Sequence, residues 1–193
     1  MKSLILCEGK NDKDFLINLI NHLSIDIFLI DIEMMKNKSN FFKIENYKTI
    51  KQKINLLYKK VLFIIDADYV ENDKIYGGYS NTKIEIEKII NELNISNKTD
   101  IYIMCNPSTN NGYLESFLLS TIKEEQKKCI NDFIECSNYK NRENHKAIIN
   151  QIYKIGYPDE TFDFTHSNFD DLKNKLFNLI KDQNADIRKT NRL

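Results

Sequence analysis

The chain has 193 residues, of which 41% are hydrophobic and 29% are charged, a composition typical of a globular protein with one well-packed core. Lysine plus arginine and aspartate plus glutamate both number 28, so the zero net charge argues against nucleic-acid binding through a general excess of positive charge. No apolar run approaches the ~20 residues that span a bilayer, and the N-terminus does not resemble a signal peptide. The four cysteines lack a Cys-x-x-Cys spacing, so we expect a reducing, cytoplasmic location without disulfides.

Strands and helices alternate in the first half of the chain. Apolar runs predict strands, and apolar residues at helical spacing predict the helices between them. In chain order, we expect a strand at 3–7, a helix with its apolar stripe at 15–23, a strand at 25–32, a helix at 49–59, a strand at 61–65, a helix with its stripe at 86–93, and a strand at 101–105. This alternation predicts an α/β fold, with a mainly parallel central sheet of about four strands flanked by helices.

The connections between these elements are polar. Gly9 is expected to take a positive φ in the turn after the first strand, and Asn11 or Asp12 is expected to cap the helix that follows. We expect an exposed loop at 36–40, a strand or a connector at 41–47, a mobile loop around Gly77-Gly78, and an irregular turn at 106–112 that leads into the apolar stretch 113–119.

The last third of the chain is predicted to be mainly helical. Helices are expected at 123–136, 144–153 and 170–181, with a break at Gly156 and Pro158, a short extended piece at 161–164, and a frayed tail from 183. We therefore divide the chain into an α/β core at 1–120 and a mainly helical C-terminal extension at 121–193 that packs on this core.

Two apolar runs end in acidic residues. Leu4-Ile5-Leu6-Cys7 leads into Glu8, and Val61-Leu62-Phe63-Ile64-Ile65 leads into Asp66-Ala67-Asp68. Buried parallel strands deliver such residues to the carboxyl edge of a sheet, and an extended backbone would point Asp66 and Asp68 to the same side. With Glu8 on a neighbouring strand, these carboxylates predict a site for a hard divalent cation.

The run Glu8-Gly9-Lys10-Asn11-Asp12, followed by Asp66-Ala67-Asp68, resembles the TOPRIM fold of topoisomerases, bacterial primases and OLD-family nucleases. In that Rossmann-like fold a Glu closes the first strand and an Asp-x-Asp closes the third. The stretch from Asn106-Pro107 to Gly112-Tyr113-Leu114-Glu115 is similar to stand-alone TOPRIM proteins near the OLD nucleases. The resemblance covers roughly residues 3–120 and extends more weakly to Lys146-Ala147 and 162–180.

The resemblance implies a role for each matching residue. Asp66 and Asp68 match the metal-binding pair, Glu8 the Glu that serves as metal ligand or general acid/base, and Asp12 and Glu115 two further acids of the metal site. Phosphodiester cleavage needs charge neutralisation and an activated water, which one or two Mg²⁺ or Mn²⁺ ions supply. The sequence departs from the pattern because no strong basic motif follows Glu115. Lys10 and Lys146 are the candidates for contacting substrate phosphate, and Lys10 is counted with Glu8 and Asp66 as catalytic.

Structural roles remain open beside these functional ones. Asp66 and Asp68 would serve as strand-end residues of a loop, Asp12 as a helix cap, and Lys10 as a surface residue. Glu115 lies in an apolar stretch, where burial without a partner is costly, so a functional role is favoured. A zinc site formed by Cys129, Cys136 and His145 lacks the short paired spacings of such sites.

The leading hypothesis is a metal-dependent nuclease that acts on DNA or RNA. The alternative is a non-catalytic or conditionally active TOPRIM subunit that works with an ATPase in a defence or plasmid-maintenance system, because the chain has no phosphate-binding loop of its own. Topoisomerase and primase activities are disfavoured, since the chain has no room for strand-passage machinery and no zinc module. No membrane partner is expected, and a homodimer stays open.

Overall fold

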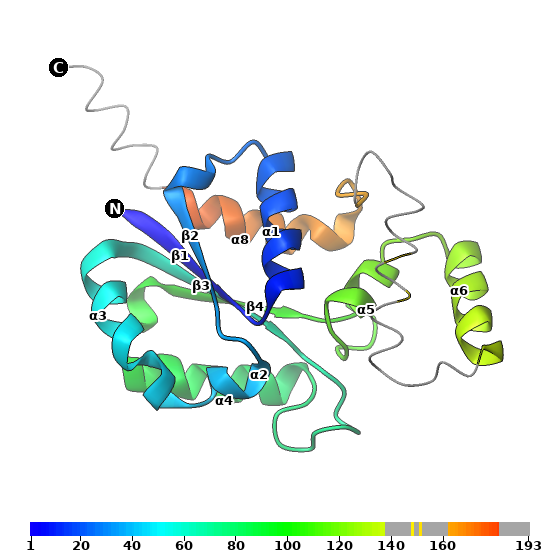
Figure 1. The fold of residues 1–193 in the computed structure, drawn as a ribbon, viewed down its shortest axis with the longest axis horizontal. Helices are drawn as coiled ribbons and strands as arrows, with labels where there is room; N and C mark the ends of the chain where they lie inside the picture. Colours follow the sequence, from blue (N-terminus) through cyan, green and yellow to red (C-terminus); the bar gives the residue numbers. More distant parts are fainter. Residues whose placement is uncertain (138–147, 149–150, 152–161, 182–193) are drawn as a thin grey trace.

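The computed structural model describes residues 1–137, 148, 151 and 162–181. Its centre is a four-stranded sheet in the order β2-β1-β3-β4, and all three strand pairings are parallel (Figure 1). The strands are β1 (Lys2–Cys7), β2 (Ile30–Met34), β3 (Tyr58–Asp66) and β4 (Thr99–Met104). The predicted α/β, Rossmann-like fold with a parallel sheet of four strands is therefore confirmed.

Helices connect the strands and follow the last one. The α-helices are α1 (Lys10–His22), α2 (Lys38–Phe41), α3 (Lys48–Leu57), α4 (Tyr79–Leu93), α5 (Leu114–Leu119), α6 (Glu124–Cys136) and α8 (Asp170–Ile180). The described residues also form the short 3-10 helices η1 (Ile27–Leu29), η2 (Ile44–Tyr47), η3 (Ser96–Lys98) and η4 (Ser167–Phe169). In the described part of the chain, no helix combines the length and the apolar character needed to cross a membrane.

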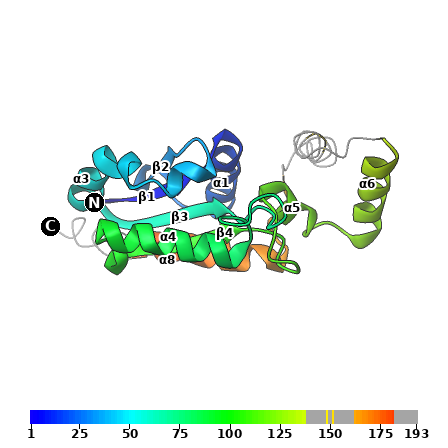
Figure 2. The same cartoon turned by 90° about the horizontal axis from the view of Figure 1, so that it is seen from below.

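Each face of the sheet is covered by its own layer of helices. Ile5 and Cys7 of β1 pack in one hydrophobic cluster with α1 and α8, whereas Leu4 and Leu6 pack in a second cluster with α3 and α4. This division follows from the alternation of side chains along a strand. Figure 1 shows α1 and α8 on one side of the sheet and α2, α3 and α4 on the other, and Figure 2 shows α5 and α6 beyond the carboxyl end of the strands.

The described C-terminal residues complete the first of these clusters. Phe162, Phe164 and Phe169 contact the ring of Phe15, and Phe169 also meets Phe117 edge to face at 5.0 Å. The Ser3 hydroxyl donates a hydrogen bond of 2.8 Å to the carbonyl of Leu179, which joins β1 to α8. Burial of each such aromatic side chain contributes roughly 1.5–3 kcal/mol, so 162–180 is a structural part of the α/β core. The predicted boundary at 120 stays a prediction.

Several local predictions are wrong. The apolar run 25–32 begins as the 3-10 helix η1, because the Asp26 side chain accepts a hydrogen bond from the Phe28 amide, and Phe28 is 79% exposed. The strand starts at Ile30. The predicted exposed loop 36–40 contains the start of α2, since the Asn37 side chain caps that helix by accepting from the Asn40 amide. Part of 41–47 forms η2.

Hydrogen-bonded turns shape the segment predicted as a mobile loop over the strand ends. The Asp73 carboxylate accepts from two amides, and the Gly77 and Gly78 amides donate to the carbonyls of Asp73 and Ala67. Gly78 has a φ of +83° and precedes α4. Residues 162–164 form bends and turns and no strand. The helix predicted at 144–153 falls mostly outside the described residues, as do Gly156, Pro158 and the tail from 183.

Candidate functional site

The carboxyl ends of the parallel strands meet at one edge of the sheet. Glu8 follows β1, Asp66 ends β3, and the residues after β2 emerge beside them. An open pocket of about 450 Å³ lies at this edge. Its lining comes from the turn into α1, the segment after β2, the end of β3 and the start of α5: Glu8, Gly9, Lys10, Asn11, Asp12, Lys36, Asn37, Asp66, Leu114 and Glu115.

Glu8 links two strand ends and stands in a negative field. Its Oε1 accepts a hydrogen bond of 3.0 Å from the Asp66 amide, which ties the end of β1 to the end of β3. Burial, followed by the neighbouring charges of Asp12 and Asp68, raises the pKa of Glu8 from 4.5 to about 7. The predicted convergence of Glu8 with the Asp-x-Asp segment therefore exists in the structure.

Asp66 and Asp12 each combine their place in the pocket with a structural hydrogen bond. The Asp66 side chain, in a residue that is 5% exposed, accepts through Oδ1 from the Leu114 amide at the start of α5, at 3.1 Å. Asp12 accepts through Oδ2 from the Gly9 amide at 2.8 Å, as the third residue of α1. The N-cap of α1 is Gly9 itself, with an extended φ of −141°, so the predicted positive φ is wrong. Asp12 caps the helix from its third position, through the bond to the Gly9 amide, and does not occupy the N-cap position.

Asp68 departs from the extended backbone that its spacing from Asp66 suggests. Its φ is +59°, in the left-handed region that Asp tolerates better than most residues. Its amide donates to the Gly112 carbonyl at 2.6 Å, and its carbonyl accepts from the Gly112 amide at 2.9 Å. The two aspartates are thus not side by side on one strand, because the chain turns after Asp66 to pair with the 106–112 segment.

Lys38 is a site residue that the sequence analysis missed. Its ammonium group donates to the carbonyl of Ala67, between the two aspartates, at 2.5 Å and lies 3.7 Å from Asp68 Oδ2. Burial lowers the pKa of Lys38, and the charges of Asp68, Glu8 and Asp66 oppose that shift. Topology supplies a signal for it: residues that follow β2 must emerge at the same edge as those that follow β1 and β3.

Glu115 is a buried acid at the pocket wall. It is the second residue of α5 and is 1% exposed, at the edge where Glu8 and Asp66 also lie. A carboxylate at such burial is costly unless other groups compensate for it. Next to it, Ser116 shares a hydrogen bond of 3.0 Å with the Tyr69 hydroxyl.

Of the two lysines predicted to contact phosphate, the structure describes only Lys10. Lys10 begins α1, is exposed, and lines the pocket. Lys146 lies outside the described residues. Lys36 also lines the pocket, from the segment after β2. Cys129 and Cys136 are exposed on α6, whereas His145 falls outside the described residues.

The donor chemistry of the pocket fits a hard divalent cation, because its acidic side chains offer carboxylate oxygens. In the residues that the structure describes, however, no group of three or more His, Cys, Asp or Glu side chains converges to hold one ion. Asp66 accepts from the Leu114 amide of α5 through Oδ1, and Asp68 pairs with Lys38 through Oδ2. The oxygen donors are gathered at one edge without being assembled into a coordination sphere.

Comparison with known protein families places the chain in one of them. The model of a family described as a protein of unknown function (DUF3226) matches residues 2–180. The chain belongs to this family. No curated protein and no solved structure matched the chain. The matched span reaches from β1 to the end of α8, so the family includes both the acidic edge and the C-terminal helix that closes the core.

Proposed function

We propose that this DUF3226 protein is a TOPRIM-type, divalent-metal-dependent phosphoryl-transfer enzyme, and that it cleaves DNA or RNA phosphodiester bonds with Mg²⁺ or Mn²⁺. The observation that carries the proposal is the lining of one pocket by Glu8, Asp12, Asp66 and Glu115. These acids come from three separate segments and meet where open parallel sheets bind their ligands. Stability alone disfavours such a gathering of like charges.

The residues divide the chemical work as follows. Glu8 and Asp66 would hold the cation, with Asp12, Glu115 and Asp68 as further oxygen donors. A bound Mg²⁺ or Mn²⁺ supplies charge neutralisation at the phosphate and lowers the pKa of water. In the metal-free chain, burial and the charges of Asp12 and Asp68 raise the pKa of Glu8 to about 7, and a bound cation would compensate the charge that these neighbours disfavour. Lys10, in the first turn of α1, presents positive charge and a helix N-terminus to an anionic substrate.

The test is cleavage of single- and double-stranded DNA and RNA with Mg²⁺ or Mn²⁺. Asp66→Asn keeps an oxygen that accepts from the Leu114 amide but removes the charge, and we expect it to lower the rate on the order of 100-fold or more. The matched control is Asp100→Asn, which removes an exposed acid from β4. Absence of cleavage on every substrate, or equal rates for wild type and Asp66→Asn, would overturn the proposal.

A second candidate is a conditionally active subunit that needs an ATPase partner. It is favoured by the engagement of Asp66 Oδ1 with the Leu114 amide and of Asp68 Oδ2 with Lys38, because these contacts hold the two carboxylates in positions where the described residues assemble no ion site. A partner that moves α5 or α2 would assemble the site.

Calorimetry with Mn²⁺ separates the two candidates when it is combined with the cleavage assay. Metal binding without cleavage by the isolated chain, together with cleavage after addition of a co-purified ATPase, favours the subunit. Cleavage by the isolated chain favours the enzyme.

A further inference from the structure

Lys38 is held at the acidic edge by two kinds of contact. Its ammonium group donates to the Ala67 carbonyl at 2.5 Å and pairs with Asp68 Oδ2 at 3.7 Å, with side chains that are 10% and 13% exposed. The same carbonyl accepts from the Gly78 amide at 2.8 Å and from the Thr82 hydroxyl at 3.3 Å. The lysine thus contacts the peptide between the two aspartates and the carboxylate of the second one.

The charges around Lys38 are those of the candidate site. Asp68, Glu8 and Asp66 are, in this order, the carboxylates that act most strongly on it. A lysine in such a buried position is costly unless it compensates other charges. Lysine suits this position because its compact ammonium charge sits on a long, flexible stem. That stem lets the charge reach a main-chain carbonyl from a neighbouring helix.

We propose that Lys38 is a built-in counter-ion of the acidic edge, a positioning residue that holds Asp68 and the Ala67 carbonyl when no metal neutralises the carboxylates. One consequence of this inference rests on the proposed metal-dependent function. If the site binds a divalent cation, the lysine and the cation stabilise the same carboxylates. Part of the need for Lys38 therefore disappears when an ion is bound, and Asp68 becomes able to turn toward that ion.

Thermal unfolding of Lys38→Met in EDTA and in MnCl₂ tests this coupling. Methionine keeps the length of the stem and removes the charge. In EDTA we expect its melting temperature to fall by about 6–20 °C, the range for breaking a buried pair in a chain of this size. In MnCl₂ we expect at least half of that deficit to disappear. Lys38→Arg keeps the charge and should lose less than Lys38→Met in EDTA.

Lys98→Met is the matched control. Lys98 is also a lysine on the end of a helix that donates to main-chain carbonyls, those of Ile54 at 2.6 Å and Tyr58 at 3.3 Å, and its pKa is also lowered by burial. It precedes β4, at the opposite edge of the sheet. Its deficit should be equal in EDTA and in MnCl₂. An equal deficit for Lys38→Met in both conditions would overturn the inference and leave metal binding by the wild type intact.

If Mn²⁺ stabilises no variant, that result counts against the proposed function. A double variant studied without metal still tests the inference about Lys38. Asp68→Asn suits the left-handed backbone at this position and removes the charge that faces Lys38. In EDTA, Lys38→Met combined with Asp68→Asn should melt higher than Lys38→Met alone. If the double variant melts at or below the single variant, Lys38 is not a counter-ion. If Lys38→Met does not fold, Asp68→Asn should still permit folding of the double variant.

Discussion

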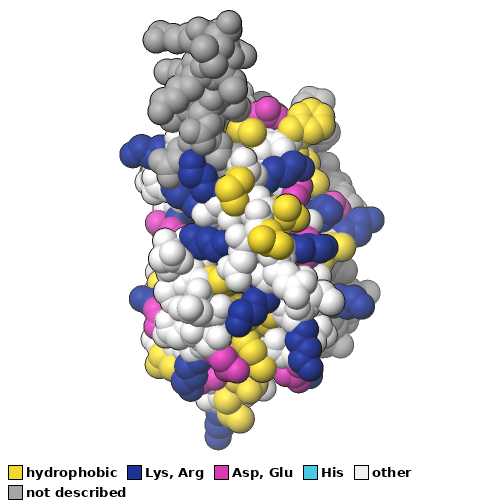
Figure 3. Space-filling view, turned by 90° about the vertical axis from the view of Figure 1, so that its left-hand side faces the viewer, with side chains coloured by type: hydrophobic (Ala, Val, Ile, Leu, Met, Phe, Trp, Pro, Cys, Tyr) yellow, Lys and Arg dark blue, Asp and Glu magenta, His cyan; other side chains and the backbone are white. Residues whose placement is uncertain are grey.

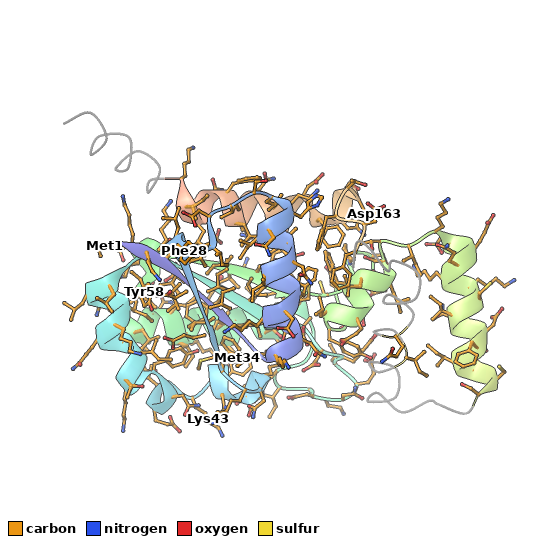
Figure 4. All side chains as sticks on the ribbon, turned by 45° about the horizontal axis from the view of Figure 1, so that its top comes forward. Met1, Phe28, Met34, Lys43, Tyr58 and Asp163 are labelled. Carbon is orange, nitrogen blue, oxygen red and sulfur yellow. The ribbon has the colours of Figure 1, made fainter. Side chains whose placement is uncertain are left out.

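The amino edge and the carboxyl edge of the sheet differ in how their charged side chains are compensated. At the amino edge, lysines contact individual carboxylates or main-chain carbonyls: Lys2 pairs with Asp31 at 2.7 Å, Lys175 pairs with Asp100 at 2.9 Å, and Lys60 donates to the carbonyl of Asn178 at 2.7 Å. Figure 3 shows this end of the molecule with many lysines and several hydrophobic side chains, and Figure 4 places Met1, Phe28 and Tyr58 toward it and Met34 nearer the middle of the molecule, beside α1.

The carboxyl edge instead gathers several acids around Lys38. Paired charges at the amino edge are exposed enough for water to screen them, whereas Asp66, Glu115 and the Lys38–Asp68 pair are buried, where charges interact more strongly. The comparison shows that a chain with zero net charge still concentrates buried acidic residues at one edge of the sheet. Stability alone explains the amino edge, whereas the carboxyl edge carries electrostatic cost that a bound cation would relieve.

The largest expected effect concerns the backbone of the acidic edge. Gly112 has a φ of +101°, and a Cβ there would stand 2.5 Å from Ser116 Oγ and 2.6 Å from its Cβ. We expect Gly112→Ala to lower the free energy of unfolding by about 2–4 kcal/mol, because strain and overlap add. Gly9→Ala is the control, since its new Cβ would find its nearest neighbour at 3.6 Å. Urea unfolding measures both, and equal losses would show that the edge imposes no special constraint at Gly112.

An intermediate effect is expected from the charge of Glu8. Its folded-state pKa of about 7 lies above its ordinary 4.5, so the folded state binds the proton more tightly. Without metal, its contribution to stability is present below pH 4.5 and is lost as the pH rises through 7, by about 3 kcal/mol. Glu8→Gln should remove this decline in urea unfolding curves recorded in EDTA between pH 4.5 and 8. A decline of the same size in Glu8→Gln would assign it to other groups.

The smallest effect is expected for Asp31 at the amino edge. Its contribution to stability falls as the pH falls, whereas that of Glu8 falls as the pH rises. Burial alone would raise the pKa of Asp31, but hydrogen bonds from Lys2 and Tyr58 outweigh it and lower the pKa below 3.8. This contribution is present above pH 3.8 and is lost as the pH falls. Asp31→Asn should lower the free energy of unfolding at pH 7 by less than about 1 kcal/mol, and 0.5 M NaCl should reduce the difference. A larger, salt-independent loss would contradict the screened, surface character of this edge.

The sequence allowed the prediction of the sheet and of most acids at its edge. The strands of β1 and β3 are apolar runs buried on both faces, a pattern that local sequence displays directly. Because parallel strands end at a common edge, Glu8 and Asp66 followed from the same pattern. Glu115 followed as an acid inside an apolar stretch, and it is indeed buried.

The rest depends on contacts that local pattern does not encode. Lys38 lies in a polar run typical of a surface loop, and it is buried because α2 brings it against Ala67 from the neighbouring connection. Asp68 turns into the left-handed region because Gly112, from a distant segment, pairs with its backbone. Asp26 converts an apolar run into a 3-10 helix through one side-chain hydrogen bond. In each case a tertiary or side-chain contact overrides the local preference.

The junction of β1 with α8 has a consequence for how the chain folds during synthesis. One face of the two central strands is covered by α8, whose Leu179 carbonyl receives the Ser3 hydroxyl across 176 positions. A nascent chain that has already made β1, α1, β3 and β4 still lacks the part of this cover that α8 supplies until residue 180 has left the ribosome. Contacts between residues so far apart in the sequence slow folding, and the apolar surface that they will bury stays exposed in the meantime. Early termination ahead of α8 should therefore yield a chaperone client.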